Sequence, residues 1–286
     1  MRFLVAVATL CTSLTVQLFG TPIDLTVEVR GGNQSFEADR QATDMTLPTD
    51  SYRFEGLGAL AVEISDGLEF VTEYERSVIF GNLARLAFRH TDQFVSVSAG
   101  AFFRMANTDT VLIKPGVLTK IRFDIAGVMY AQFLSERTLR VGTTGVGDYV
   151  TDNLDIAGGI YLPNAILTLR YHAESQQEST DSGSTVDSVT EYLAEVDVFA
   201  KNVPYRVLLT FGYRGVTKSF DDVAQSMGLL ILGTYLETDL GSSVTYAVGV
   251  DSSVYTFGRN ELLGEFANES YVFEAATTLT VSLGNP

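Results

Sequence analysis

Residues 192–214 read YLAEVDVFAKNVPYRVLLTFGYR and hold two stretches in which apolar and polar side chains alternate. One face of both stretches is apolar: Tyr192, Ala194, Val196, Val198 and Ala200, then Tyr205, Val207, Leu209, Phe211 and Tyr213. The other face carries Glu195, Asp197 and Lys201, then Arg206, Thr210 and Arg214. A period of two is that of a β-strand with one apolar face. The turn-forming segment Asn202-Val203-Pro204 between the two stretches predicts an antiparallel hairpin.

The same period recurs from one end of the chain to the other. It is most regular in residues 23–30, IDLTVEVR, and it returns in residues 271–283. Most such segments approach the roughly 9 to 11 residues that a tilted strand needs to cross a bilayer. After the first twenty residues no run of 18 apolar residues occurs, so a membrane role would have to be carried by strands.

Short and long connections alternate between these segments. The short turns are Ser65-Asp66-Gly67, His90-Thr91-Asp92, Pro163-Asn164, Asn202-Val203-Pro204 and Asp239-Leu240-Gly241. The longer polar links are residues 31–53, 105–117, 174–190, 215–225 and 256–269. This arrangement is typical of an all-β, closed, antiparallel, up-and-down transmembrane barrel with its short turns in the periplasm. We expect 12 to 14 strands, and 14 if one strand runs from about Arg137 to Thr143.

The N-terminal segment predicts export. Arg2 is followed by the apolar run Phe3–Leu10, so residues 1–20 are interpreted as a signal peptide and residues 21–286 as the barrel. Cleavage after Ser13 is the alternative to cleavage after Gly20. Cys11 is the only cysteine, and cleavage at either position leaves no thiol for a disulfide.

The net charge and the composition limit the classes of partner that the protein can bind. The formal net charge is −16, which disfavours nucleic acid because phosphate backbones attract Lys and Arg. Hydrophobic residues make up 46% of the chain and charged residues 19%, which suits either a large core or a lipid-facing surface.

The pattern across residues 23–283 resembles the bacterial outer-membrane β-barrels, in the size class of OmpG-type porins and small FadL-like barrels. The resemblance implies a place in the outer membrane, with the bilayer, the barrel-insertion machinery and small solutes as partners. It rests on pattern without a family motif, and two features depart from it. The plug segment of FadL-like transporters is missing, and Gly284-Asn285-Pro286 stands where such barrels commonly end on an aromatic residue.

If the apolar positions face lipid, the polar positions line a lumen. The predicted lumen-lining residues are Glu28, Arg30, Glu69, Glu73, Glu75, Arg85, Arg89, Arg104, Lys120, Arg122, Asp124, Arg170, Glu195, Asp197, Arg206 and Arg214. Acidic and basic ladders on neighbouring strands would set a field across a water-filled pore. The alternative is that the same residues form salt bridges that fill a narrow barrel.

Tyrosines recur near the ends of the apolar faces in a chain that has no tryptophan. We interpret Tyr171, Tyr192, Tyr205, Tyr213, Tyr235, Tyr246 and Tyr271 as aromatic girdles at the membrane interfaces. The alternative is that they are ordinary β-sheet aromatics.

Catalysis is not expected. Only His90 and His172 could serve as a general base, and no metal-ligand cluster, phosphate-binding glycine loop or cofactor motif is present. We therefore predict no catalytic residue, no metal and no cofactor. The predicted function is passive diffusion of small hydrophilic solutes through a charged lumen. The alternatives are FadL-like uptake of hydrophobic molecules and a surface-exposed structural or adhesin barrel without an open pore.

Overall fold

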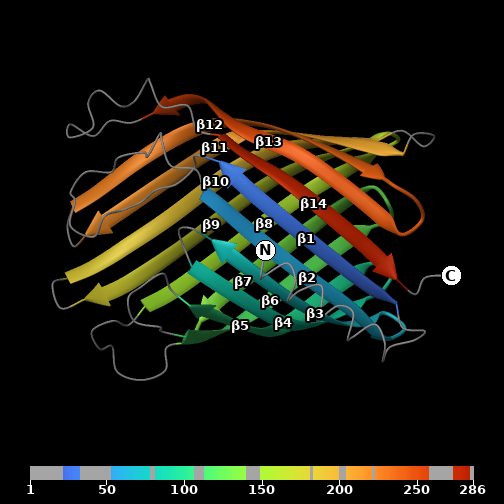
Figure 1. Cartoon of the computed structure of the whole chain (residues 1–286), viewed down its shortest axis with the longest axis horizontal. Coiled ribbons are helices and arrows are strands. Elements are labelled where there is room, and N and C mark those ends of the chain that lie inside the picture. The colour runs from blue at the N-terminus through green and yellow to red at the C-terminus, as the bar shows by residue number, and fades with distance from the viewer. Residues whose placement is uncertain are drawn as a thin grey trace.

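The protein folds as a single ring of fourteen β-strands (Figure 1). The computed structural model describes residues 22–32, 53–77, 81–105, 113–139, 149–180, 183–199, 204–220, 223–257 and 273–283. The strands are β1 (Ile23–Gly32), β2 (Arg53–Ser65), β3 (Leu68–Ser77), β4 (Gly81–Thr91), β5 (Val95–Met105), β6 (Ile113–Ile125) and β7 (Met129–Thr138). They continue with β8 (Tyr149–Leu162), β9 (Ala165–Thr180), β10 (Gly183–Phe199), β11 (Tyr205–Phe220), β12 (Val223–Asp239), β13 (Val244–Phe257) and β14 (Phe273–Leu283). The predicted signal segment lies outside these residues.

The sheet closes on itself through β1 and β14, which run antiparallel beside each other (Figure 1). Ile23 pairs with Leu283 and Gly32 with Glu274, so the start of β1 and the end of β14 meet at one end of the barrel. Every other strand pairs with its neighbours in sequence. The predicted closed up-and-down barrel is confirmed, at the larger of the two expected strand numbers. Among the described residues no helix is long and apolar enough to cross a membrane.

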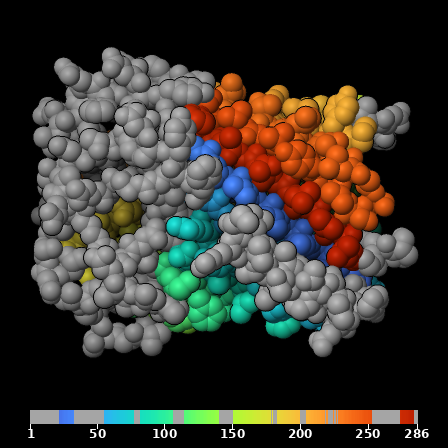
Figure 2. Space-filling view, viewed as in Figure 1, coloured from blue at the N-terminus to red at the C-terminus, as the bar shows by residue number. Residues whose placement is uncertain are grey.

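Alternation along each strand sorts side chains between the outside and the inside of the barrel. On β11, Leu209 and Phe211 point outward and are 42% and 54% exposed, whereas Thr210 between them is buried. Large apolar side chains are exposed in the same way around the ring, as Phe88, Phe133 and Leu232 illustrate. Figure 2 shows part of this outer wall, where the atoms of β1, β13 and β14 pack side by side. Such a surface is costly in water and favourable in hydrocarbon, and a closed barrel leaves no strand edge unpaired in lipid.

A row of three tyrosines marks one border of this apolar surface. Tyr171, Tyr192 and Tyr213 are register partners on β9, β10 and β11, and the rings of Tyr171 and Tyr192 lie 5.1 Å apart. Beyond this row the outward positions become polar: Ser175, Gln177, Ser188, Thr190 and Thr217. At the other end of β11, Tyr205 shares a register row with Tyr246. The eight residue steps from Tyr205 to Tyr213 span about 26 Å along the strand. At a strand tilt of about 40° this corresponds to a height of about 20 Å, comparable with the apolar height of roughly 25 Å expected for such barrels.

Strands continue through two segments that were predicted to be long links. β9 extends to Thr180 and β10 starts at Gly183, and β11 extends to Phe220 with β12 starting at Val223. The prediction was wrong because these strand ends project past the tyrosine row. Their outward positions are polar, so they lack the apolar outward face by which the other strands were found.

The fourteenth strand was expected from Arg137 to Thr143, but the structure has β7 at Met129–Thr138. Its inward face includes Leu134, and its outward face ends in Ser135 and Arg137. Arg137 lies 3.3 Å from Asp152 on the outward face of β8. The strand thus changes surroundings halfway along, which hides its period of two.

The predicted short turns lie together at one end of the barrel, with a further turn between β6 and β7 that the sequence did not reveal, where Val128 N donates to Ile125 O (2.8 Å). At the opposite end, links of three, two and two residues join β3 to β4, β9 to β10 and β11 to β12, so the predicted alternation of short and long connections is wrong there. At the β4–β5 turn Asp92 accepts hydrogen bonds from Phe94 N (2.7 Å) and Val95 N (2.8 Å), which hold the pKa of this carboxyl below its usual value.

The β6–β7 turn contains backbone strain that a substitution can relieve. Ala126 has a φ of +47° and Gly127 a φ of +67°, and a left-handed backbone costs an alanine roughly 1–2 kcal/mol. We expect Ala126→Gly or Ala126→Asn to raise the free energy of unfolding by about 0.5–1 kcal/mol, since both residues accept positive φ in such turns. Urea unfolding in detergent micelles would measure the change. Equal or lower stability of both variants would contradict it.

Candidate channel interior

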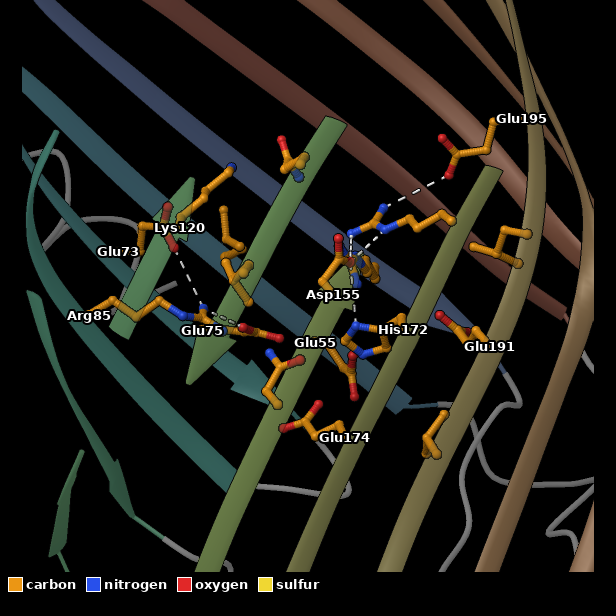
Figure 3. Close-up of a pocket in the computed structure, with 18 of the residues that line it drawn as sticks. Glu55, Glu73, Glu75, Arg85, Lys120, Asp155, His172, Glu174, Glu191 and Glu195 are labelled. Carbon is orange, nitrogen blue, oxygen red and sulfur yellow. Dashed lines mark hydrogen bonds and ion pairs between the residues drawn. The ribbon is translucent and has the colours of Figure 1, made fainter. Parts of the chain in front are cut away.

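The inward faces of the strands enclose a cavity of about 590 Å³ lined largely by charged side chains (Figure 3). The described lining residues include nine carboxylates, five arginines, one lysine and one histidine. The carboxylates are Glu55, Glu73, Glu75, Asp155, Glu174, Glu191, Glu195, Asp251 and Glu274. The bases are Arg30, Arg85, Arg89, Arg170, Arg214, Lys120 and His172. An interior of this composition is compatible with water and ions, since unsolvated charges cost several kcal/mol each.

Arg85 on β4 organises one side of the cavity. Its Nη1 lies 2.8 Å from Glu75 Oε2 and 3.6 Å from Glu73 Oε2 on β3, so it sits between the two carboxylates (Figure 3). Its Nη2 donates to Glu136 Oε2 on β7 (3.1 Å), which also accepts from Asn153 Nδ2 (3.1 Å). Since β5 and β6 lie between β4 and β7, this contact spans the inside of the barrel wall.

A second ion pair crosses a wider part of the interior. Arg104 Nη2 on β5 lies 2.6 Å from Glu174 Oε1 on β9, and three strands separate β5 from β9. The Arg104 side chain is 3% exposed and that of Glu174 15%. Beneath these charges Leu83, Ala87, Phe102 and Leu118 form a buried apolar cluster on β4, β5 and β6. Wall side chains therefore fill part of the lumen near the ends of the strands that face away from the short turns.

Smaller polar networks occupy the half of the interior near the short turns. Arg122 Nε donates to Asp124 Oδ2 (2.8 Å), its Nη2 donates to Tyr161 Oη (2.7 Å), and its guanidinium lies 4.0 Å from the centre of the Tyr130 ring. Arg206 lies between Asp197 and Glu237, 3.2 Å from the latter. These groups are more exposed than the ion pairs in the other half, so this end of the lumen is wetter.

The structure places the predicted lumen residues on inward faces. Nine of them line the cavity directly: Arg30, Glu73, Glu75, Arg85, Arg89, Lys120, Arg170, Glu195 and Arg214. The others form inward ion pairs: Glu28 with Arg30, Glu69 with Arg89, Arg104 with Glu174, Arg122 with Asp124, and Asp197 with Arg206.

Tyr235 corrects the predicted girdle. Its ring lines the cavity, and its hydroxyl donates to Asp251 Oδ2 (2.5 Å). The ring lies where a Cβ on Gly249 would be 2.0 Å from Tyr235 Cδ1, so the absent side chain at Gly249 makes room for it. Tyr171, Tyr192, Tyr205, Tyr213 and Tyr246 lie on outward faces. Tyr271 lies outside the described residues.

Several cavity residues were absent from the prediction. Glu174 and Glu191 lie at the two ends of the segment that was predicted to be a link. Glu136, the buried partner of Arg85, lies on the strand that was misplaced. Asp155 on β8 accepts from Arg170 Nε (2.6 Å) and lies 3.5 Å from His172 Nδ1. Asp251 and Glu274 alternate with apolar neighbours in the sequence, so the period of two could have revealed them. No group of three or more potential metal ligands occurs in the described part of the chain.

Comparison with known proteins agrees with this architecture. No protein-family model matches the chain, and no curated protein matches it in sequence. Among solved structures, an outer membrane channel from Pseudomonas putida F1 is similar with a TM-score of 0.50 and 9% identity, over 93% of this chain and 96% of that one. A monoaromatic hydrocarbon channel, the TodX deltaS2S3 mutant, aligns with a TM-score of 0.47 and 8% identity over 94% and 91% of the chains. A porin aligns with a TM-score of 0.42 and 11% identity over 91% and 100%.

At these identities the likeness concerns the fold, and the surface of the molecule shows the environment. The ring of strands is closed, the outward face carries an apolar band edged by tyrosines, and the inward face is charged. The chain therefore has the fold of the bacterial outer-membrane β-barrels and lies in the outer membrane.

Proposed function

We propose that this barrel is a channel for the passive diffusion of small hydrophilic solutes. The observation that carries the proposal is the composition of the 590 Å³ cavity, whose lining includes nine carboxylates and six arginine or lysine side chains. Bases and acids are unevenly distributed around the wall. Arg85, Arg89 and Lys120 supply the charges that line the cavity from β4 to β6, whereas β2 and β3 contribute Glu55, Glu73 and Glu75.

This distribution supports a polar permeant over an apolar one. Opposed charges create a field across the lumen in which a dipolar solute can orient and exchange hydration water for side-chain contacts. An apolar molecule would displace that water without replacing its hydrogen bonds, which costs several kcal/mol for each charge left bare. FadL-like uptake of hydrophobic molecules is therefore the disfavoured alternative. Insertion of the barrel by the outer-membrane insertion machinery is part of the same proposal.

Single-channel recording tests the proposal. The protein extracted from outer membranes and reconstituted in a planar bilayer is expected to give steady conductance steps that increase with KCl concentration. Liposomes that contain it should swell in small sugars or amino acids. Absence of conductance from protein whose gel mobility shifts on heating, as a folded barrel's does, would contradict the proposal. Saturable fatty-acid binding by that protein would favour the hydrophobic alternative.

A further inference from the structure

One register row of the lumen brings three carboxylates together. The row runs across β10, β11, β12, β13, β14 and β1 through Glu195, Thr210, Gly233, Asp251, Glu274 and Gly32, and it continues on β2 at Arg53. Of these, Glu195, Thr210, Asp251 and Glu274 line the cavity. Glu195 lies 3.9 Å from Arg170 Nη1, whereas Asp251 and Glu274 have no basic residue at an adjacent position of the row.

Asp251 and Glu274 are directly opposed on β13 and β14. Like charges directly opposite each other in a sheet are destabilising, so a barrel under selection for stability alone would not place them together. The Glu274 side chain makes no hydrogen bond or ion pair with any other described residue, although Arg30 and Arg214 are near enough to attract it. Asp251 accepts one from Tyr235, and its Oδ1 is buried without a partner in the described structure. Local rules of stability are most often broken at functional positions.

The absence of a side chain at Gly233 leaves room for the Asp251 carboxylate. A Cβ at Gly233 would lie 1.9 Å from Asp251 Oδ1, so any larger residue would push this carboxylate away. On the other flank Gly32 adds no side chain beside Glu274. The row is therefore shaped to present the two carboxylates to the cavity without neutralising them.

Within the described residues, no arginine of the lumen makes an ion pair with Asp251 or Glu274. Arg89 pairs with Glu69, Arg170 with Asp155 and Glu195, and Arg214 with Glu191. Arg30 pairs with Glu28, and Arg85 with Glu75 and Glu136. Lys120, on β6, makes no ion pair with any other residue that the structure describes. Among the described lining residues, nine carboxylates against six Arg and Lys side chains leave a surplus of three negative charges.

We infer that the channel selects small cations over anions and that Asp251 and Glu274 set this preference. The inference rests on the proposed channel function. Uncompensated carboxylates in a confined, water-filled lumen raise the local concentration of cations and exclude anions. Pairs such as Arg214 with Glu191 contribute little to the preference because their charges cancel locally.

The reversal potential of the reconstituted protein under a tenfold KCl gradient measures the preference. The unmodified protein is expected to give a K⁺ to Cl⁻ permeability ratio above 1. Asp251→Asn combined with Glu274→Gln should lower that ratio at least twofold with little change in single-channel conductance at high salt. Lys120→Gln should raise it, because it removes a positive charge from the opposite wall. Asp152→Asn, which removes a carboxylate from the outward face, is the matched control and should leave the ratio unchanged.

The outcomes separate the two proposals. Absence of conductance from folded protein overturns the channel function and the selectivity with it. Conductance with a ratio at or below 1, or a ratio that the double variant leaves unchanged, overturns the cation preference alone. If the double variant does not fold, as judged by heat-modifiable gel mobility, Glu274→Gln alone and Lys120→Gln decide through their opposite shifts.

Discussion

Replacing Arg104 by alanine is expected to lower the free energy of unfolding by about 3–5 kcal/mol, the cost of leaving one partner of a buried ion pair uncompensated. The Arg104 side chain is 3% exposed and reaches Glu174 across three intervening strands. Its loss leaves the largely buried Glu174 carboxylate, which is 15% exposed at the cavity lining, without its cation. Equilibrium unfolding by urea in detergent micelles measures the effect.

Two controls identify the cause. Arg104→Met combined with Glu174→Leu removes both charges and should recover most of the lost stability, as replacement of a buried pair by apolar groups often does. Arg206→Ala breaks a pair in which the arginine is 49% exposed, and we expect it to cost less than about 1 kcal/mol. Equal losses of stability for Arg104→Ala and Arg206→Ala would contradict the prediction that the buried pair contributes more to stability than the exposed pair.

Placing an arginine at Leu209 is expected to destabilise the inserted barrel by about 2–4 kcal/mol, the cost of a cation at the bilayer midplane. Leu209 faces outward on β11, equally far along the strand from Tyr205 and Tyr213. Thr217→Arg is the matched control, because Thr217 lies on the same face of the same strand but beyond the tyrosine row. It should change stability by less than about 1 kcal/mol.

Folding into lipid vesicles and into detergent distinguishes this cost from a packing defect. Leu209→Arg should fold less completely into vesicles than Thr217→Arg does. If both variants insert equally well, the apolar band between the tyrosines does not face hydrocarbon.

The membrane-spanning parts of the strands could be read from the sequence because two different solvents act on their two faces. On β11, lipid selects Val207, Leu209 and Phe211 on one side, while water and partner charges select Arg206 and Arg214 on the other. Where both faces are polar, as in Ser175–Thr180 of β9, this contrast is lost, and the sequence of a strand looks like that of a loop.

The error at Tyr235 has a different origin. Around it β12 is apolar on both faces, since Leu229 and Ile231 are buried inside while Leu232 and Leu236 are exposed outside. The alternation of residue types along that strand therefore does not tell which side chains point inward. The space for the tyrosine ring is left by Gly249 on the neighbouring strand, and it depends on the register between the two strands.

The ion pairs between strands that are not neighbours could not be predicted, for the same reason. Alternation predicts that Arg104 points inward, but its partner Glu174 is 70 residues away in the sequence and four strands around the ring. Such a pair depends on the curvature of the closed barrel and on which side chains leave space. The alternation of residues along one strand indicates neither the curvature nor the available space.

Accessibility of spin labels placed singly at residues 207–211 on β11, in protein whose Cys11 is replaced by serine, tests the central claim most directly. The account predicts that labels at Val207, Leu209 and Phe211 collide mainly with lipid-soluble oxygen. Labels at Leu208 and Thr210 should instead collide mainly with a water-soluble nickel chelate. Outward positions that both reagents fail to reach would mean that they pack against protein, and would contradict a barrel with lipid outside and water within.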